Sequence, residues 1–146
     1  MTLKETIAYH KELNQKGIVA FPEKIPNVPI QKVIDEALRG NVHLSMVFSE
    51  GIETSEKEFL VAAFNALEYD AYDISDEFGN YIITNYSFEA MLKELSIQRT
   101  KEILEEHDVI AQNCTSIIKL REKDELTFLI QTNTQYIFIS EIFWWS

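Results

Sequence analysis

The sequence predicts an α+β fold, with N-terminal helices and short strands packed on a mixed sheet that ends in a C-terminal three-strand antiparallel meander. Helix-period apolar patterns dominate the first two thirds of the chain, and β-prone runs joined by short polar links fill the last third. Helices followed by a meander favour a sheet with its helices on one face. The chain has 146 residues and shows no repeat or linker, so we expect a single globular domain over 1–146.

Caps and apolar spacing define the first two predicted helices. A helix over about 3–15 begins at Thr2, and Glu5 three residues later completes a capping box. A second helix over about 30–38 places apolar residues at the i, i+3, i+4, i+7 and i+8 spacing of one buried face. Gly40 is well placed to end it.

The rest of the chain predicts three more helices and two groups of strands. Ser55 is placed to cap a helix over about 56–67, Ser87 to cap one that begins at 88, and a further apolar stripe predicts a helix over about 100–111. Strand-forming residues predict short strands at 17–21, 42–48 and 81–85, and a meander built from 115–120, 126–131 and 135–144.

The negative charge of the chain is concentrated in one segment. The formal net charge is −11. Residues 40–92 contain ten acids against the single base Lys57, a net charge of −9, which leaves −2 for the rest of the chain. Charge of one sign over some fifty residues is self-repelling, and a basic partner would relieve that repulsion. The competing interpretation is an acidic surface that mainly keeps the protein soluble.

The segment from Glu68 to Tyr81 combines acids with aromatic residues. Carboxylates steer a cationic partner, and aromatic side chains supply the desolvated anchors of protein interfaces. We therefore predict an acidic protein-binding module, most concretely an immunity- or antitoxin-type inhibitor of a basic, nuclease-like toxin. The competing interpretation is a surface loop whose aromatic side chains fold back onto the core. The predicted partner-binding residues are Glu53, Glu56, Glu68, Asp70, Tyr72, Asp73, Asp76 and Glu77.

No motif for catalysis, metal or cofactor binding is recognisable. His10, His43 and His107 are far apart and lack zinc-site spacing, and four scattered glycines build no phosphate-binding loop. We therefore predict no catalytic residue, no metal and no cofactor. The alternative is a small enzyme whose site is assembled from dispersed residues, for example a pair of Cys114 with His10 or His43.

Composition also limits the partners and the compartment. The acidity argues against nucleic acid as a ligand, and no apolar run is long enough to span a membrane. A lone cysteine and an N-terminus without a signal pattern predict a cytoplasmic protein. Trp144 and Trp145 would face opposite sides of a C-terminal strand, so a homodimer through that strand is a third possibility.

Overall fold

The protein is built around one six-stranded sheet. The computed structural model describes residues 2–16, 27–68, 81–121 and 125–143. In this part of the chain the strand order is β1-β2-β6-β5-β4-β3 and every pair is antiparallel. The strands are β1 (Ile30–Leu38), β2 (Val42–Ser49), β3 (Thr84–Asn85), β4 (Cys114–Arg121), β5 (Glu125–Thr132) and β6 (Tyr136–Phe143). The α+β class and the C-terminal meander are confirmed, although the pairing is antiparallel throughout where a mixed sheet was expected.

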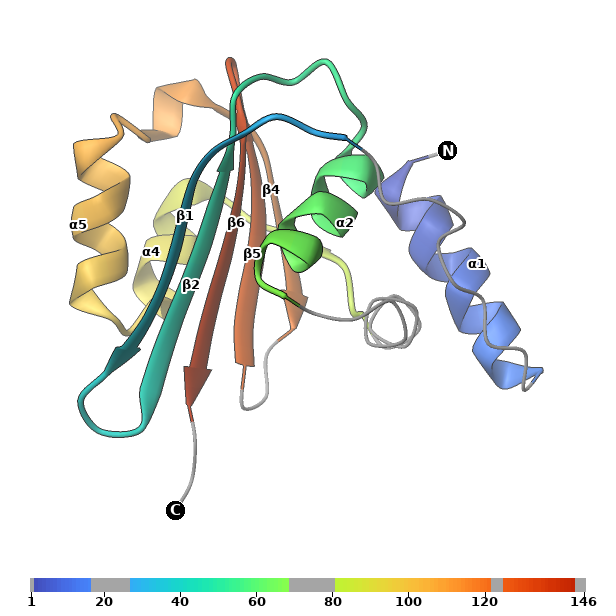
Figure 1. The fold of residues 1–146 in the computed structure, drawn as a ribbon, viewed down its shortest axis with the longest axis horizontal. Coiled ribbons are helices and arrows are strands. Elements are labelled where there is room, and N and C mark those ends of the chain that lie inside the picture. The colour runs from blue at the N-terminus through green and yellow to red at the C-terminus, as the bar shows by residue number, and fades with distance from the viewer. Residues whose placement is uncertain (1, 17–26, 69–80, 122–124, 144–146) are drawn as a thin grey trace.

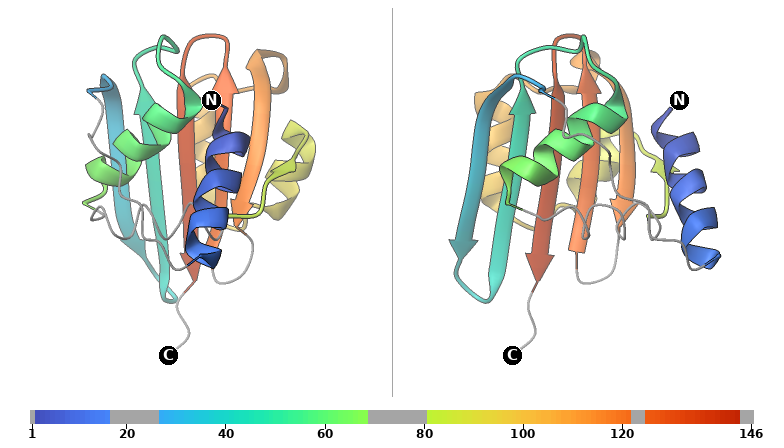
Figure 2. Two further views of the ribbon diagram at one scale, coloured as in Figure 1. Left: turned by 90° about the vertical axis from the view of Figure 1, so that its right-hand side faces the viewer. Right: turned by 45° about the vertical axis from the view of Figure 1, so that its right-hand side comes forward.

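Helices lie on both faces of this sheet (Figure 1 and Figure 2). Two of them, α1 (Leu3–Gln15) and α2 (Glu56–Ala66), share one face. On the other face lie α4 (Phe88–Glu94) and α5 (Gln98–Glu106), followed by the short 3₁₀ helix η1 (Ala111–Asn113). The expectation of helices on one face was therefore wrong. None of the described helices is long and apolar enough to cross a membrane.

Each face of the sheet carries its own core because side chains alternate along the strands. Val47 and Phe138 point to the α1/α2 face and pack with Phe64 of α2. Met46 and Ile139 point to the opposite face, with the helices α4 and α5. A sheet buried on both faces explains why the C-terminal strands are apolar at successive positions rather than at alternate ones.

The predicted helix over 30–38 is wrong, because these residues form the strand β1. They pair with β2 from Leu38↔Val42 to Ile30↔Ser49. The hairpin turn between them holds Gly40 at φ 77° and Asn41 at φ 61°, both in the left-handed region that a tight turn requires. Gly40 thus closes a hairpin instead of ending a helix.

The other predicted helices are close to those observed. Thr2, Ser55 and Ser87 cap α1, α2 and α4 with their hydroxyl oxygens, as expected. α5 ends earlier than predicted because Asp108 adopts φ 55° and the Val109 N–H turns back to the Leu104 carbonyl at 2.9 Å. The predicted strand over 17–21 lies outside the described residues.

Candidate functional site

Three of the predicted partner-binding residues lie in the described part of the chain. Glu53 and Glu56 lie at the N-terminal end of α2, whereas Glu68 follows its C-terminal end at φ 64°. Eleven helical residues separate the two ends by roughly 16 Å. The structure therefore places Glu53 and Glu56 at one end of α2 and Glu68 at the other. The remaining five predicted residues lie outside the described residues: Asp70, Tyr72, Asp73, Asp76 and Glu77.

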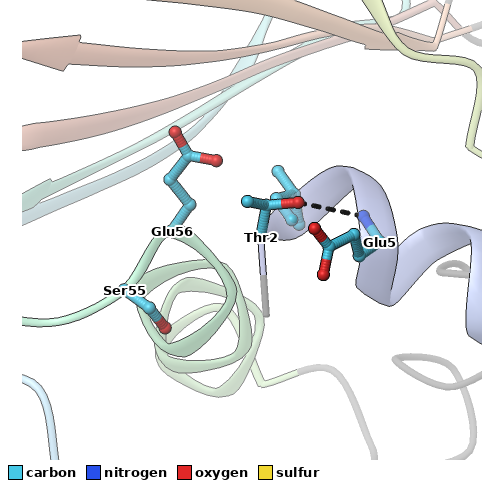
Figure 3. Close-up of a pocket in the computed structure, with 5 residues that line it drawn as sticks. Thr2, Glu5, Ser55 and Glu56 are labelled. Atoms are coloured by element: carbon cyan, nitrogen blue, oxygen red, sulfur yellow. Dashed lines mark hydrogen bonds between the residues drawn. The ribbon is translucent and has the colours of Figure 1, made fainter.

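The N-termini of α1 and α2 meet at a pocket of about 380 Å³. Figure 3 shows the side chains of Thr2 and Glu5 on α1 and of Glu56 on α2 around it. Leu3 and Ser55 complete the lining. Two carboxylates from helices that are far apart in sequence thus border one hollow.

A repeated local motif starts both helices. The Thr2 hydroxyl accepts a hydrogen bond from the Glu5 N–H at 3.2 Å, and the Ser55 hydroxyl accepts one from the Glu58 N–H at 3.1 Å. Acids in the first turn also interact favourably with the helix dipole. The sequence predicts Thr2 and Glu5 only as a cap, because a capping box does not reveal that two helix ends meet.

Glu56 differs from the other acids of the first turns because it is half-buried. Burial raises the pKa of its carboxyl group. Among the described residues it has no hydrogen-bond or ion-pair partner. Burial also raises the pKa of the nearby Tyr136 phenol, and the charges of Glu56 and Glu58 raise it further. Negative charge is therefore held at this site without a balancing base among the residues that the structure describes.

The loop that precedes α2 is anchored to β2 and β6. The Tyr136 hydroxyl donates to the Thr54 carbonyl at 2.8 Å, and the Ser49 hydroxyl donates to the Gly51 carbonyl at 2.7 Å. Ser49 also accepts a hydrogen bond from the Tyr136 N–H at 2.7 Å. The Tyr136 ring stacks on Phe59 of α2, with the ring centroids 5.3 Å apart. These contacts fix the loop that carries Glu53 before any partner arrives.

A second pocket lies near His107. A pocket of about 220 Å³ lies beyond the end of α5, and the His107 ring beside it stacks on Phe48 at a centroid distance of 4.3 Å. Cys114 does not line this pocket, and burial raises the pKa of its thiol, which is opposite to what a nucleophilic cysteine needs. The pocket is lined by His107, Asp108, Val109, Asn113, Thr132, Asn133, Thr134 and Gln135.

Neither metal-binding groups among the described residues nor related proteins assign a function to the chain. Within residues 2–16, 27–68, 81–121 and 125–143, no group of three or more His, Cys, Asp or Glu side chains could hold a metal ion. No protein family, curated protein or solved structure matches the chain. The pocket between the two helix N-termini is therefore the candidate site on its geometry and charge alone.

Proposed function

We propose that this protein is an acidic binding module that neutralises a basic partner protein, of the nuclease-like toxin class, by stoichiometric binding. The observation that carries the proposal is the half-buried carboxylate of Glu56, which lines a pocket and has no base among the described residues. A desolvated charge without a counter-charge is unfavourable. A Lys or Arg side chain of a partner would supply the missing ion pair.

The pocket suits such a side chain in size and in charge. Its volume of about 380 Å³ lies within the range of pockets that enclose small ligands. Glu5 and Glu56 line it from two different helices, so both carboxylates would attract a cationic group that enters the pocket. Because the loop carrying Glu53 is anchored by Tyr136, little conformational freedom would be lost on binding.

The wider charge distribution supports association with a basic protein. The net charge of −9 over residues 40–92 would accelerate the encounter with a cationic surface and make it sensitive to salt. A nuclease binds phosphates through basic side chains, so an acidic inhibitor can occupy the same surface without any catalytic residue. The contact residues of this proposal are Glu53, Glu56, Glu68, Asp70, Tyr72, Asp73, Asp76 and Glu77.

The proposal is tested by affinity capture with three baits. Wild-type protein, a Glu53→Lys/Glu56→Lys variant and a Glu105→Lys control are immobilised and exposed to lysate of the native cell at low and high salt. Glu105 is an exposed acid of α5, on the other face of the sheet. We expect the wild type and the control to retain the same basic protein at low salt. The double variant should lose it.

The salt dependence and stoichiometry complete the test. Capture should weaken at high salt, since screening reduces attraction between exposed charges. Purified partner and bait should then form a complex of equal amounts, and the partner's activity should fall in proportion to the bait added. Retention that the double variant leaves unchanged, or the absence of any basic protein, would contradict the proposal.

A further inference from the structure

Among the described strands, β1 forms a long edge of the sheet. This nine-residue strand pairs with β2 on one side, and no described strand pairs with its other side. At the opposite edge, β3 has only two residues. The C-terminal strand β6 is paired on both sides, with β2 and β5, and Trp144 and Trp145, at which a dimer contact was expected, lie outside the described residues. Unpaired N–H and C=O groups along a strand edge are a template for a further strand.

The side chains of β1 form a self-complementary pattern around Ile34. Lys32 lies two residues before Ile34 and Glu36 two residues after it, so all three point to the same face of the sheet. Lys32 is exposed and has no ion pair with any described residue. Val33, which lies between Lys32 and Ile34 in the sequence and points to the other face, exposes 41% of its surface.

The acids of β1 differ in how far they are already engaged. The Asp35 carboxylate is in hydrogen-bond contact with the His43 ring, and it accepts a hydrogen bond from the Ser45 hydroxyl at 2.9 Å. Glu36 interacts with Arg99 of α5 through the attraction of their charges, and its side chain forms no hydrogen bond or ion pair with any described residue. Glu36 is therefore the acid of β1 that is available to a lysine arriving at the edge.

We propose that two copies of this chain form a twofold-symmetric dimer by antiparallel pairing of β1 with β1, with Ile34 opposite Ile34 of the second copy. In this register Lys32 of each copy lies directly opposite Glu36 of the other. The two ion pairs flank the axis, and the Ile34 side chains join the cores of the α4/α5 faces. An interface of this kind uses the same residues on both subunits, and pairing extends the sheet from six strands to twelve. This inference is independent of the proposed partner binding.

The neighbouring registers are less favourable. Centring the pair on Asp35 places this carboxylate directly opposite its own copy, which is destabilising. Centring it on Val33 places Lys32 opposite the apolar Ile34. Only even shifts keep like faces together, because a shift by one residue moves every side chain to the other face. On the α4/α5 face the register centred on Ile34 thus matches charge with charge and apolar residue with apolar residue, while on the other face it places Val33 opposite Asp35.

Charged residues on an edge strand also serve to prevent aggregation. Charges of a single sign would achieve this at least as well. The opposite signs of Lys32 and Glu36, placed symmetrically about Ile34, are the feature that self-pairing uses and that edge protection does not require.

The proposal is tested by sedimentation equilibrium of charge variants between about 1 and 200 μM. We expect the wild type to dimerise. Lys32→Glu and Glu36→Lys each replace two attractive pairs by two repulsive ones, so each should dimerise at least roughly ten-fold more weakly. Lys4→Glu, an equal charge change at an exposed position of α1, should leave the dimer intact.

Mixing the two single variants gives the decisive result. The Lys32→Glu variant carries acids at both flanking positions of β1, and the Glu36→Lys variant carries bases at both. Each acid of one variant then faces a base of the other, so an equimolar mixture should form a heterodimer, detected by native mass spectrometry. Far-UV circular dichroism checks that each variant is folded. A monomeric wild type, single variants that dimerise normally, or a mixture that stays monomeric would each overturn the proposed register.

Discussion

The Thr100 hydroxyl donates a hydrogen bond of 2.7 Å to the carboxylate of Glu141, and this contact joins helix α5 to the central strand β6. Glu141 is fully buried. Its carboxylate also accepts hydrogen bonds from the N–H groups of Ser96 at 3.0 Å and of Ile97 at 3.2 Å. Ile97, at the N-cap position of α5, offers no side-chain cap. Glu141 of the sequence-distant strand β6 provides the capping acceptor instead.

Glu141→Gln should destabilise the fold by about 1–3 kcal/mol, because the amide carries one acceptor oxygen in place of two and turns a donor toward other donors. Urea denaturation followed by circular dichroism measures the change. Glu125→Gln is the matched control, since Glu125 pairs with Arg121 at a partly exposed site and should cost less than about 1 kcal/mol. Equal costs for the two variants would show that the capping role is wrong.

Gly40→Ala should destabilise the β1–β2 hairpin by about 1 kcal/mol through the backbone alone. Gly40 has φ 77°, and an added Cβ would meet no atom within 4 Å. Gly40→Asn should cost less, because asparagine tolerates the left-handed region better than alanine. Thermal unfolding of the three proteins gives the order. An alanine variant as stable as the wild type would contradict the left-handed turn.

The same hairpin shows where sequence reasoning about the fold fails. Apolar residues from Ile30 to Leu38 match a helical stripe, yet Ile34 is the one residue of β1 that is buried. Pairing with β2 outweighs this local pattern. The Gly40-Asn41 dipeptide directly before a β-prone run was the available hairpin signal. Caps, in contrast, were predictable, because Thr2, Ser55 and Ser87 act within one helical turn.

The part of the candidate site that lies on α2 could be predicted from the sequence, but the part that lies on α1 could not. The acids near Ser55 can be read from the sequence. Whether Glu5 lies at the same pocket as Glu56 depends on how α1 packs beside α2 on the sheet, and no residue spacing predicts that packing. The position of β1 at the edge of the described sheet could not be predicted for a related reason, because strand order is a long-range property. The pattern of Lys32 and Glu36 becomes informative only once β1 is known to be an edge.

The free energy of unfolding should decrease as the pH is lowered, because the unfolded chain then binds a proton at His10. Burial lowers the pKa of His10 below 6.5, and the charge of Lys57 lowers it further. The folded state therefore resists protonation, so its stability is fully present above pH 6.5 and is lost as the pH falls below that value. The free energy of unfolding can change by up to about 1.4 kcal/mol per pH unit when one proton is bound.

His10→Gln should remove this part of the pH dependence. Denaturation curves between about pH 7.5 and 5.5 compare the variant with the wild type. Because the variant also loses buried packing, the slope with pH is the informative quantity and not the absolute stability. An unchanged slope would show that His10 is not the titrating group.

Glu56→Gln should stabilise the free protein at neutral pH while it weakens capture of a basic partner. Burial raises the pKa of Glu56 above 4.5. The charged side chain therefore destabilises the fold fully at a pH above its pKa in the folded state. This effect disappears once the pH falls below the pKa that Glu56 has in the unfolded chain. Solvent screening of this half-exposed group limits the gain to about 0.5 kcal/mol.

Glu58→Gln separates this effect from the helix dipole. Glu58 shares the first turn of α2 but is exposed, so its substitution loses the favourable dipole interaction without relieving desolvation. The denaturation midpoints of Glu56→Gln and Glu58→Gln should therefore differ at pH 7. Near pH 4, where Glu56 is protonated in the folded state, the two midpoints should be similar. If Glu56→Gln gains stability and loses the partner, the site exchanges stability for binding; if it binds like the wild type, the burial of Glu56 has another cause.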